Sequence, residues 1–339
     1  MYRNNGGYLL LEDGAVFHGE QYLGREPALG EAVFNTSHTG YQEILTDPSY
    51  RRQLMVFTAP HIGNVGVNPE DDESEAVQVA GALVRSLSPR PSSWRSRASL
   101  PEWLEEREKP LLSGVDTRAV TLHLRSKGAM RAGLFSSTVD RESALAQVRE
   151  SPSMESADLA REVTCREAYE FEPKAADRCP ERAGGPRVAV IDFGVKRNIL
   201  RELYRRGCDV TVLPATTSPE RIIDRGYQGA LISNGPGDPA ATTYGVELVR
   251  ALLTSKNWDR PLFGICLGHQ LLALAAGGRT FKLPFGHRGG NHPVRREVDA
   301  AVEITSQNHG FAVVPEGVDL EYRVTHTNLN DGTVEGLEH

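Results

Sequence analysis

The stretch that most constrains the fold runs from Pro186 to Gly278, where short apolar segments alternate with helical ones. RVAVIDFG, DVTVLP, GALIS and RPLFGI are typical of buried strands, whereas KRNILRELYRRG, SPERIIDRG, YGVELVRALLTS and LGHQLLALA are typical of helices. This alternation predicts an α/β fold with a mostly parallel sheet and helices on both of its faces. In such sheets, sites form outside the carboxyl ends of the strands.

The chain before this stretch has a different pattern of apolar residues. From Gly7 to about Ser137 it is rich in short strand-like segments, and a helix-period segment, DTRAVTLHLRSKGAM, lies within it. A charged stretch with Pro and Gly follows, and it is typical of a linker. The sequence therefore predicts a strand-rich α/β N-terminal domain over residues 1–150, a linker over 151–185 and a second domain over 186–339.

Composition excludes several classes of function. The net charge of −7 gives no electrostatic reason to bind nucleic acid or a membrane surface, and SPRPSSWRSR around Trp94 is expected to be a solvated loop. Four irregularly spaced cysteines form neither a disulfide framework nor a metal signature. No signal peptide and no apolar stretch of membrane-spanning length is found. We therefore expect a cytoplasmic protein with reduced thiols.

Cys266 stands where an apolar strand segment turns into a helix, with Gly264 two residues before it and Gly268 two after. A nucleophile at such a corner has a strained backbone, and its neighbours at these two positions must be small. The helix N-terminus favours a thiolate, and the backbone N–H of Leu267 is suited to hold an oxyanion. The alternative is a buried structural cysteine, because free cysteine is among the most buried residue types.

The motif GICLGHQ resembles the nucleophile motif of the class I glutamine amidotransferases. TGYQEILTDPSY, PHIGNVGVN, GVDTRAVT, VIDFGVKRNILREL, LISNGPGDP and SQNHGFAV extend the resemblance to the small-chain family of carbamoyl-phosphate synthase. These segments run from Thr39 to Val313 and follow the order of that family.

The resemblance implies a role for each matching residue. Cys266 would attack the side-chain amide of glutamine, form a γ-glutamyl thioester and release ammonia. The loop from Gly235 to Gly237 and the backbone of Leu267 would hold the substrate and its oxyanion. The remaining expected substrate-binding residues are Gln270, Asn308, Gly310 and Phe311, with Ser49 reaching the same pocket from the N-terminal domain.

One part of the family pattern is missing. The resemblance implies a catalytic base in a His-Pro-Glu segment on the C-terminal side, and no such segment occurs in the 339 residues. The one His-Pro pair, at His292, is followed by Val294, and by alignment we expect the sequence to stop before the motif, with His339 too early to be its histidine. His269 is expected to face away from the thiol, and His309 to be a hydrogen-bonded turn residue.

Three functions remain open at this point. The first is a glutamine-hydrolysing enzyme subunit, impaired when alone, that supplies ammonia for arginine biosynthesis, pyrimidine biosynthesis or both. No ATP-binding loop and no metal site is found in the chain, so the resemblance implies a large partner chain that uses ATP, Mg²⁺ and bicarbonate. The second is a non-catalytic docking or regulatory subunit that retains the glutamine pocket. The third is a different cysteine hydrolase on the same fold, which would leave the N-terminal domain unexplained.

Overall fold

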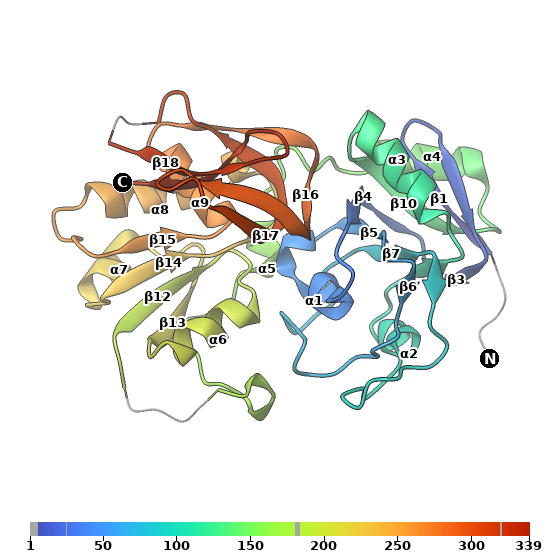
Figure 1. Ribbon diagram of the computed structural model, residues 1–339, viewed down its shortest axis with the longest axis horizontal. Helices are drawn as coiled ribbons and strands as arrows, with labels where there is room; N and C mark the ends of the chain where they lie inside the picture. Colours follow the sequence, from blue (N-terminus) through green and yellow to red (C-terminus); the bar gives the residue numbers. More distant parts are fainter. Residues whose placement is uncertain (1–5, 25, 180–183, 319–320) are drawn as a thin grey trace. The chain divides into compact units, whose positions relative to one another are not determined.

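The computed structural model describes residues 6–24, 26–179, 184–318 and 321–339 (Figure 1). The chain divides into two compact units, and each is described by itself. Unit 1 comprises Met1–Met154 and Pro284–Asn291, and unit 2 comprises Glu155–Leu283 and His292–His339. In the described part of the chain no helix is long and apolar enough to cross a membrane.

Unit 1 is built on a mixed sheet of eight strands in the order β2-β1-β10-β4-β5-β7-β9-β3. The pairs β4–β5, β5–β7 and β7–β9 are parallel, and the remaining pairs are antiparallel. The strands are β1 (Gly7–Leu11), β2 (Val16–Gly19), β3 (Gln21–Leu23), β4 (Ala28–Asn35), β5 (Gln53–Phe57), β7 (Gly81–Val84), β9 (Leu111–Ser113) and β10 (Met130–Ser136), with β6 (His61–Ile62) and β8 (Ser86–Leu87) in a separate pair. The helices are α1 (Tyr41–Thr46), α2 (Leu100–Glu106), α3 (Thr117–Lys127) and α4 (Arg141–Glu150), with a 3₁₀ turn at Pro48–Tyr50.

Side chains that alternate along β4 face two separate cores. Val33 packs with residues of α1 and α2, whereas Ala32 and Phe34 pack with Val120 and Leu124 of α3. The period of two along a strand places these sets on opposite faces of the sheet, so both faces are covered by helices. This confirms the strand-rich α/β interpretation of the N-terminal half.

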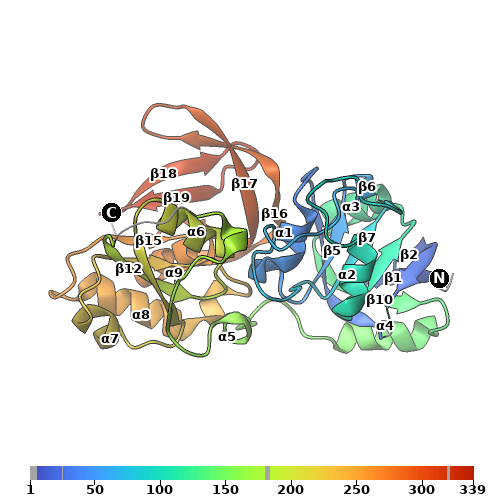
Figure 2. The ribbon, with the colours of Figure 1, turned by 90° about the horizontal axis from the view of Figure 1, so that it is seen from below.

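Unit 2 contains the alternating elements that the sequence predicts (Figure 2). Its sheet has the order β11-β13-β12-β14-β15, and β13, β12, β14 and β15 are parallel. Its elements are α5 (Ala160–Val163), β11 (Tyr169–Glu170), β12 (Arg187–Asp192), α6 (Arg197–Arg205), β13 (Asp209–Pro214), α7 (Pro219–Asp224), β14 (Gly229–Ile232), α8 (Thr243–Thr254), β15 (Leu262–Gly264) and α9 (Leu267–Ala275), with 3₁₀ turns at Ala175–Asp177 and Pro239–Ala241.

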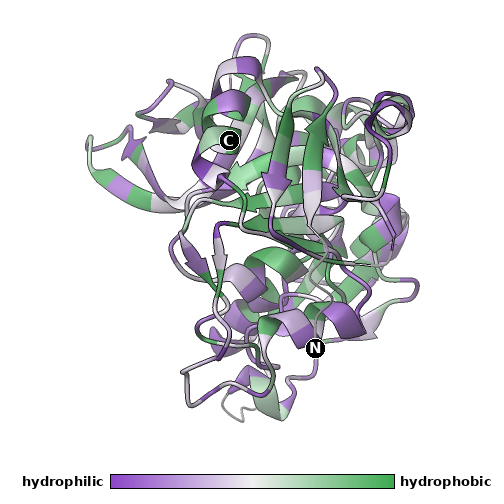
Figure 3. Cartoon of the chain, turned by 90° about the vertical axis from the view of Figure 1, so that its right-hand side faces the viewer, coloured by the Kyte–Doolittle hydropathy of each residue, from purple (hydrophilic) through white to green (hydrophobic). Residues whose placement is uncertain are grey.

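The helices cover both faces of this parallel sheet, as predicted. Ile191 of β12 packs with Leu248 of α8 and Leu271 of α9, whereas Val190, its neighbour in the strand, packs with Leu200 of α6. Figure 3 faces the elements of unit 1, where the central strands are largely green and the helices mix green with purple, as expected when only one side of each helix is buried.

Four strands close the chain as a small barrel in the order β16-β17-β19-β18. They are β16 (Arg279–Arg296), β17 (Val302–Val314), β18 (Arg323–Asn328) and β19 (Val334–Glu338). A buried cluster of Ala273 on α9 with Val313 and Val334 packs β17 and β19 against the helix that begins after Cys266.

The segment 151–185 contains more structure than the linker expected there. Its described part includes α5, and β11 pairs antiparallel with β13 at the edge of the sheet. The side chain of Asp177 is fully buried between Arg197 and Arg201 of α6, at 2.6 and 2.7 Å. Residues 180–183 lie outside the described residues.

Candidate active site

Cys266 occupies a strained corner between β15 and α9. Its φ of 54° and ψ of −108° lie outside the regions that side-chain-bearing residues normally adopt. Such a conformation costs about 1–3 kcal/mol and persists only where the surrounding packing imposes it. The structure therefore agrees with the elbow predicted from the sequence.

The two flanking glycines show why the corner admits no larger residues. A Cβ on Gly264 would lie 2.5 Å from the carbonyl carbon of Gly268. A Cβ on Gly268 would lie 2.0 Å from the carbonyl oxygen of Ile232, at the end of β14. Both contacts are with backbone atoms, so neither can be relieved by rotation of a side chain.

The first turn of α9 is fixed against the end of the neighbouring strand. The N–H of Gly268 donates to the carbonyls of Ser233 and Ile265, both at 3.0 Å, and the N–H of Gln270 donates to the carbonyl of Cys266 at 3.1 Å. Leu267 is the first residue of the helix, so its N–H has no helical carbonyl one turn earlier. This N–H is the donor in the first turn best suited to an oxyanion.

The Gly-Pro-Gly loop passes beside this helix start. A Cβ on Gly235 would lie 2.2 Å from the carbonyl oxygen of Phe193 and 2.8 Å from the Cδ2 atom of Leu267. Gly237 has a φ of 92°, and a Cβ there would lie 2.4 Å from the carbonyl oxygen of Ala157. The backbone of Ala157 is therefore sufficient to require a glycine at position 237.

Strand β17 contacts the same turn of α9. The sulfur of Cys266 lies 3.6 Å from the carbonyl oxygen of Asn308, to which the thiol donates. The side-chain amide of Gln270 donates to the carbonyl of Phe311 at 2.7 Å, and both residues are buried. Gly310 precedes Phe311 in this strand. The expected pocket residues of unit 2 thus come together around the start of α9, although their contact with glutamine stays a prediction.

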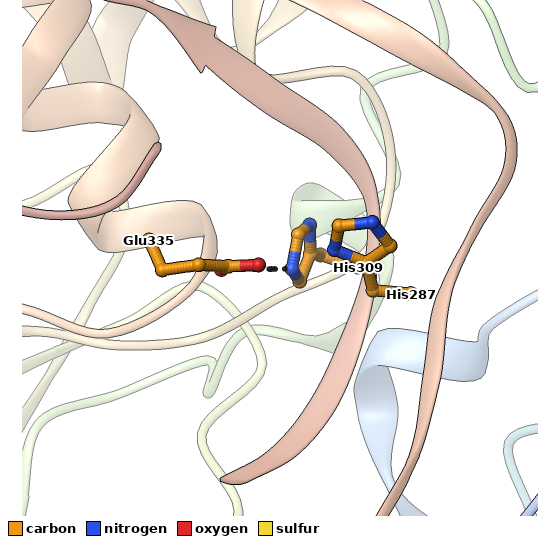
Figure 4. Close-up of side chains that lie close together, drawn as sticks. All are labelled: His287, His309 and Glu335. Carbon is orange, nitrogen blue, oxygen red and sulfur yellow. Dashed lines mark ion pairs between the residues drawn. The ribbon is translucent and has the colours of Figure 1, made fainter. Parts of the chain in front are cut away.

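His309 is not a turn residue, contrary to the sequence-based expectation, because it lies within β17. Its Nδ1 atom lies 2.7 Å from the carbonyl oxygen of Phe311, and its Nε2 atom lies 3.3 Å from a carboxylate oxygen of Glu335 on β19 (Figure 4). Figure 4 also draws His287, which belongs to unit 1. Glu335 could not be found from the sequence, because a single carboxylate in a short strand forms no motif.

His269 is a poor candidate for the missing base. Its Nε2 atom is buried and has no hydrogen-bond partner. Burial, reinforced by His309 and opposed by Glu335, lowers the pKa of His269 to about 4. The ring is therefore neutral near pH 7, and no hydrogen bond orients its Nε2 atom as a base requires.

Ser49 lies in unit 1, in the 3₁₀ turn at Pro48–Tyr50. It is buried, and its backbone N–H donates to the side chain of Asp47 at 2.9 Å. Its expected role in the glutamine pocket stays a prediction.

Cys165 is unsuited to act as a second nucleophile. Burial and the neighbouring carboxylate of Asp192 raise the pKa of Cys165 to about 12, which keeps its sulfur protonated. All four cysteines are free thiols. The structure distinguishes Cys266 by its place at a strained corner next to a helix N-terminus.

Comparisons with known proteins agree with this geometry. Residues 189–339 match the family model described as glutamine amidotransferase class-I, and residues 9–134 match carbamoyl-phosphate synthase small chain, CPSase domain. The second domain is thus a class I glutamine amidotransferase domain.

Curated relatives narrow the class to one family. A carbamoyl phosphate synthase small chain from Syntrophotalea carbinolica is 49% identical over 98% of this chain and 88% of its own length. A protein of the same description from a Nostoc species is 48% identical over 98% of this chain and 86% of its own length. The chain belongs to the carbamoyl-phosphate synthase small-chain family.

Proposed function

We propose that the chain hydrolyses glutamine and supplies ammonia to a large partner chain that makes carbamoyl phosphate. The observation that carries this proposal is the position of Cys266, strained at a helix N-terminus beside a Gly-rich loop. The names of the relatives and the family match support a subunit of this synthase. ATP, Mg²⁺ and bicarbonate are proposed to bind the partner. A cytoplasmic location and a role in arginine biosynthesis, pyrimidine biosynthesis or both remain predictions.

The chemistry follows from the groups around the thiol. The Cys266 thiolate attacks the carbonyl carbon of the glutamine side chain, and the N–H of Leu267 stabilises the negative oxygen that develops. The carbon–nitrogen bond then breaks, the leaving nitrogen takes a proton and departs as ammonia, and a γ-glutamyl thioester remains. Water hydrolyses the thioester to glutamate and restores the thiol.

The proton transfers need a base. Among the described histidines, His269 is unsuited to this role, because it is buried and neutral and its Nε2 atom has no hydrogen-bond partner.

The test compares two nitrogen sources in the complex of this chain with a large chain. Cys266→Ser should abolish carbamoyl phosphate synthesis from glutamine and leave synthesis from ammonia intact. Cys165→Ser is the matched control and should retain both, because its sulfur stays protonated. Equal loss from both nitrogen sources in Cys266→Ser would mean that Cys266 is structural, and a wild-type chain without glutaminase activity that still stimulates its partner would favour the docking role.

A further inference from the structure

A buried pair of side chains lies next to the segment of β17 that contacts Cys266. His309 on β17 and Glu335 on β19 are 3.3 Å apart, and their side chains are only 9% and 8% exposed (Figure 4). The other carboxylate oxygen of Glu335 accepts a hydrogen bond from the side chain of Asn328 on β18 at 2.7 Å. Three barrel strands thus contribute to one polar cluster.

The contacts of His309 orient its ring. A carbonyl oxygen can only accept a hydrogen bond, so the Nδ1 atom donates to the carbonyl of Phe311. The Nε2 atom on the opposite side of the ring lies at ion-pair distance from Glu335, although this contact does not have hydrogen-bond geometry.

The burial of the pair makes the loss of either partner costly. Removal of one partner leaves a buried polar or charged group on the other without its contact.

The pair is connected to the candidate site through one carbonyl group. The carbonyl of Phe311 accepts from His309 Nδ1 and from Gln270 Nε2, both at 2.7 Å. Gln270 lies one helical turn after Cys266, and Asn308, next to His309, lies 3.6 Å from the sulfur of Cys266. The orientation of the His309 ring thus sets the position of the strand segment that contacts both ends of this helical turn.

The geometry points to Glu335 as a positioning residue for glutamine capture, acting through His309 on residues 308–311 of β17. This inference rests on the proposed function, since it assumes that these residues line the glutamine pocket. A positioning role of this kind changes the affinity for glutamine more than the reactivity of the thiol, because the corner at Cys266 is held by Gly264, Gly268 and the end of β14.

The test measures alkylation of Cys266 in the 339-residue chain by iodoacetamide, with and without L-glutamine, read by mass spectrometry of the Cys266 peptide. The concentration of glutamine that halves the alkylation rate reports affinity. Glu335→Gln should raise this concentration about 10-fold or more, the effect expected when a buried contact to a charged group is lost. The rate of Cys266 alkylation without glutamine should change by less than about twofold, the margin expected when two sites are not coupled.

A double-mutant comparison shows whether Glu335 acts through His309. His309→Asn retains a short donor for the Phe311 carbonyl but removes the nitrogen that faces Glu335. Glu335→Gln added to His309→Asn should weaken protection by less than about twofold beyond the single variant. Glu338→Gln, on the same strand but in an exposed ion pair with Arg323, is the matched control and should behave as wild type.

The outcomes are distinguishable. Equal protection of Glu335→Gln and wild type, multiplying losses in the double variant, or a loss confined to alkylation without glutamine would each overturn the inference. Absence of protection in the wild-type chain would overturn the proposed glutamine site and this inference together. If thermal unfolding shows that Glu335→Gln does not fold, Glu335→Asp, which keeps the charge and shortens its reach, replaces it and should show the same non-additivity with His309→Asn.

Discussion

The packing at the Cys266 corner predicts a large effect from the smallest possible substitution. Gly268→Ala adds one methyl group inside α9, and in an unconstrained helix this change would stabilise the protein by about 1 kcal/mol. Here the added carbon would lie 2.0 Å from the carbonyl oxygen of Ile232, far inside van der Waals contact. Since the obstacle is backbone, α9 must move away from β14.

The magnitude follows from these two opposed effects. Overpacking of a well-packed site costs about 1–3 kcal/mol, and a backbone obstacle places this substitution at the upper end. After the gain in helix propensity, we expect a net loss of about 2 kcal/mol in the free energy of unfolding. For a unit of this size, that loss lowers the Tm by about 4–8 °C.

The assay is thermal unfolding of the 339-residue chain, combined with glutamine protection of Cys266 from alkylation. Gly229→Ala is the matched control, because Gly229 lies in the same strand as Ile232 and a Cβ there would meet only the Pro261 carbonyl at 3.6 Å. It should be neutral or stabilising by up to about 1 kcal/mol. If Gly268→Ala unfolds at the same temperature as Gly229→Ala and still binds glutamine equally well, the crowding argument for the corner is wrong.

Two further predictions concern other parts of the chain. Ser49→Ala should weaken glutamine capture about 10- to 150-fold, the effect of one lost hydrogen bond to a charged group, and an unchanged KM for glutamine would remove Ser49 from the pocket. Burial raises the pKa of Asp177, but hydrogen bonds from Arg197 and Arg201 outweigh burial and hold it well below its usual range, so this stabilisation is present at neutral pH and lost as the pH falls below about 4. Asp177→Asn should cost about 3–5 kcal/mol at pH 7 and flatten the acid limb of the stability profile, and an unchanged limb in denaturant titrations would contradict this.

Local patterns were sufficient to predict the parallel sheet. Each strand from β12 to β15 is followed by a helix whose apolar spacing is visible in the sequence, and β12, β13 and β14 are buried on both faces. The segment RPLFGI was wrongly expected to be a buried strand, because β15 lies at the edge of the sheet and its Phe263 is 62% exposed. The corner at Cys266 was predictable for a similar reason. Its steric demand falls on Gly264 and Gly268, which lie two residues away in the chain, so the requirement leaves a compact local motif.

Features that depend on distant pairing were not predictable in this way. Strand β11 is two residues long and exposed, so Tyr169 and Glu170 carry no strand periodicity, and their pairing with β13 depends on the sheet already being present. The contact between His309 and Glu335 likewise requires the barrel to bring β17 beside β19. Composition and spacing cannot indicate such a contact, because neither residue belongs to a recognisable sequence motif with the other.

The candidate site is likewise assembled from local constraints on one side and long-range contacts on the other. The nucleophile is positioned by short-range constraints, since the strain at Cys266 is held by the glycines on either side and by β14. The opposite wall, residues 308–311, is positioned by long-range contacts through Gln270, His309 and the barrel. Substitutions in the barrel should therefore weaken glutamine capture more than they change the reactivity of the thiol. Substitutions at the Cys266 corner should affect both. A variant series that separates these two responses would locate the source of preorganisation in the site.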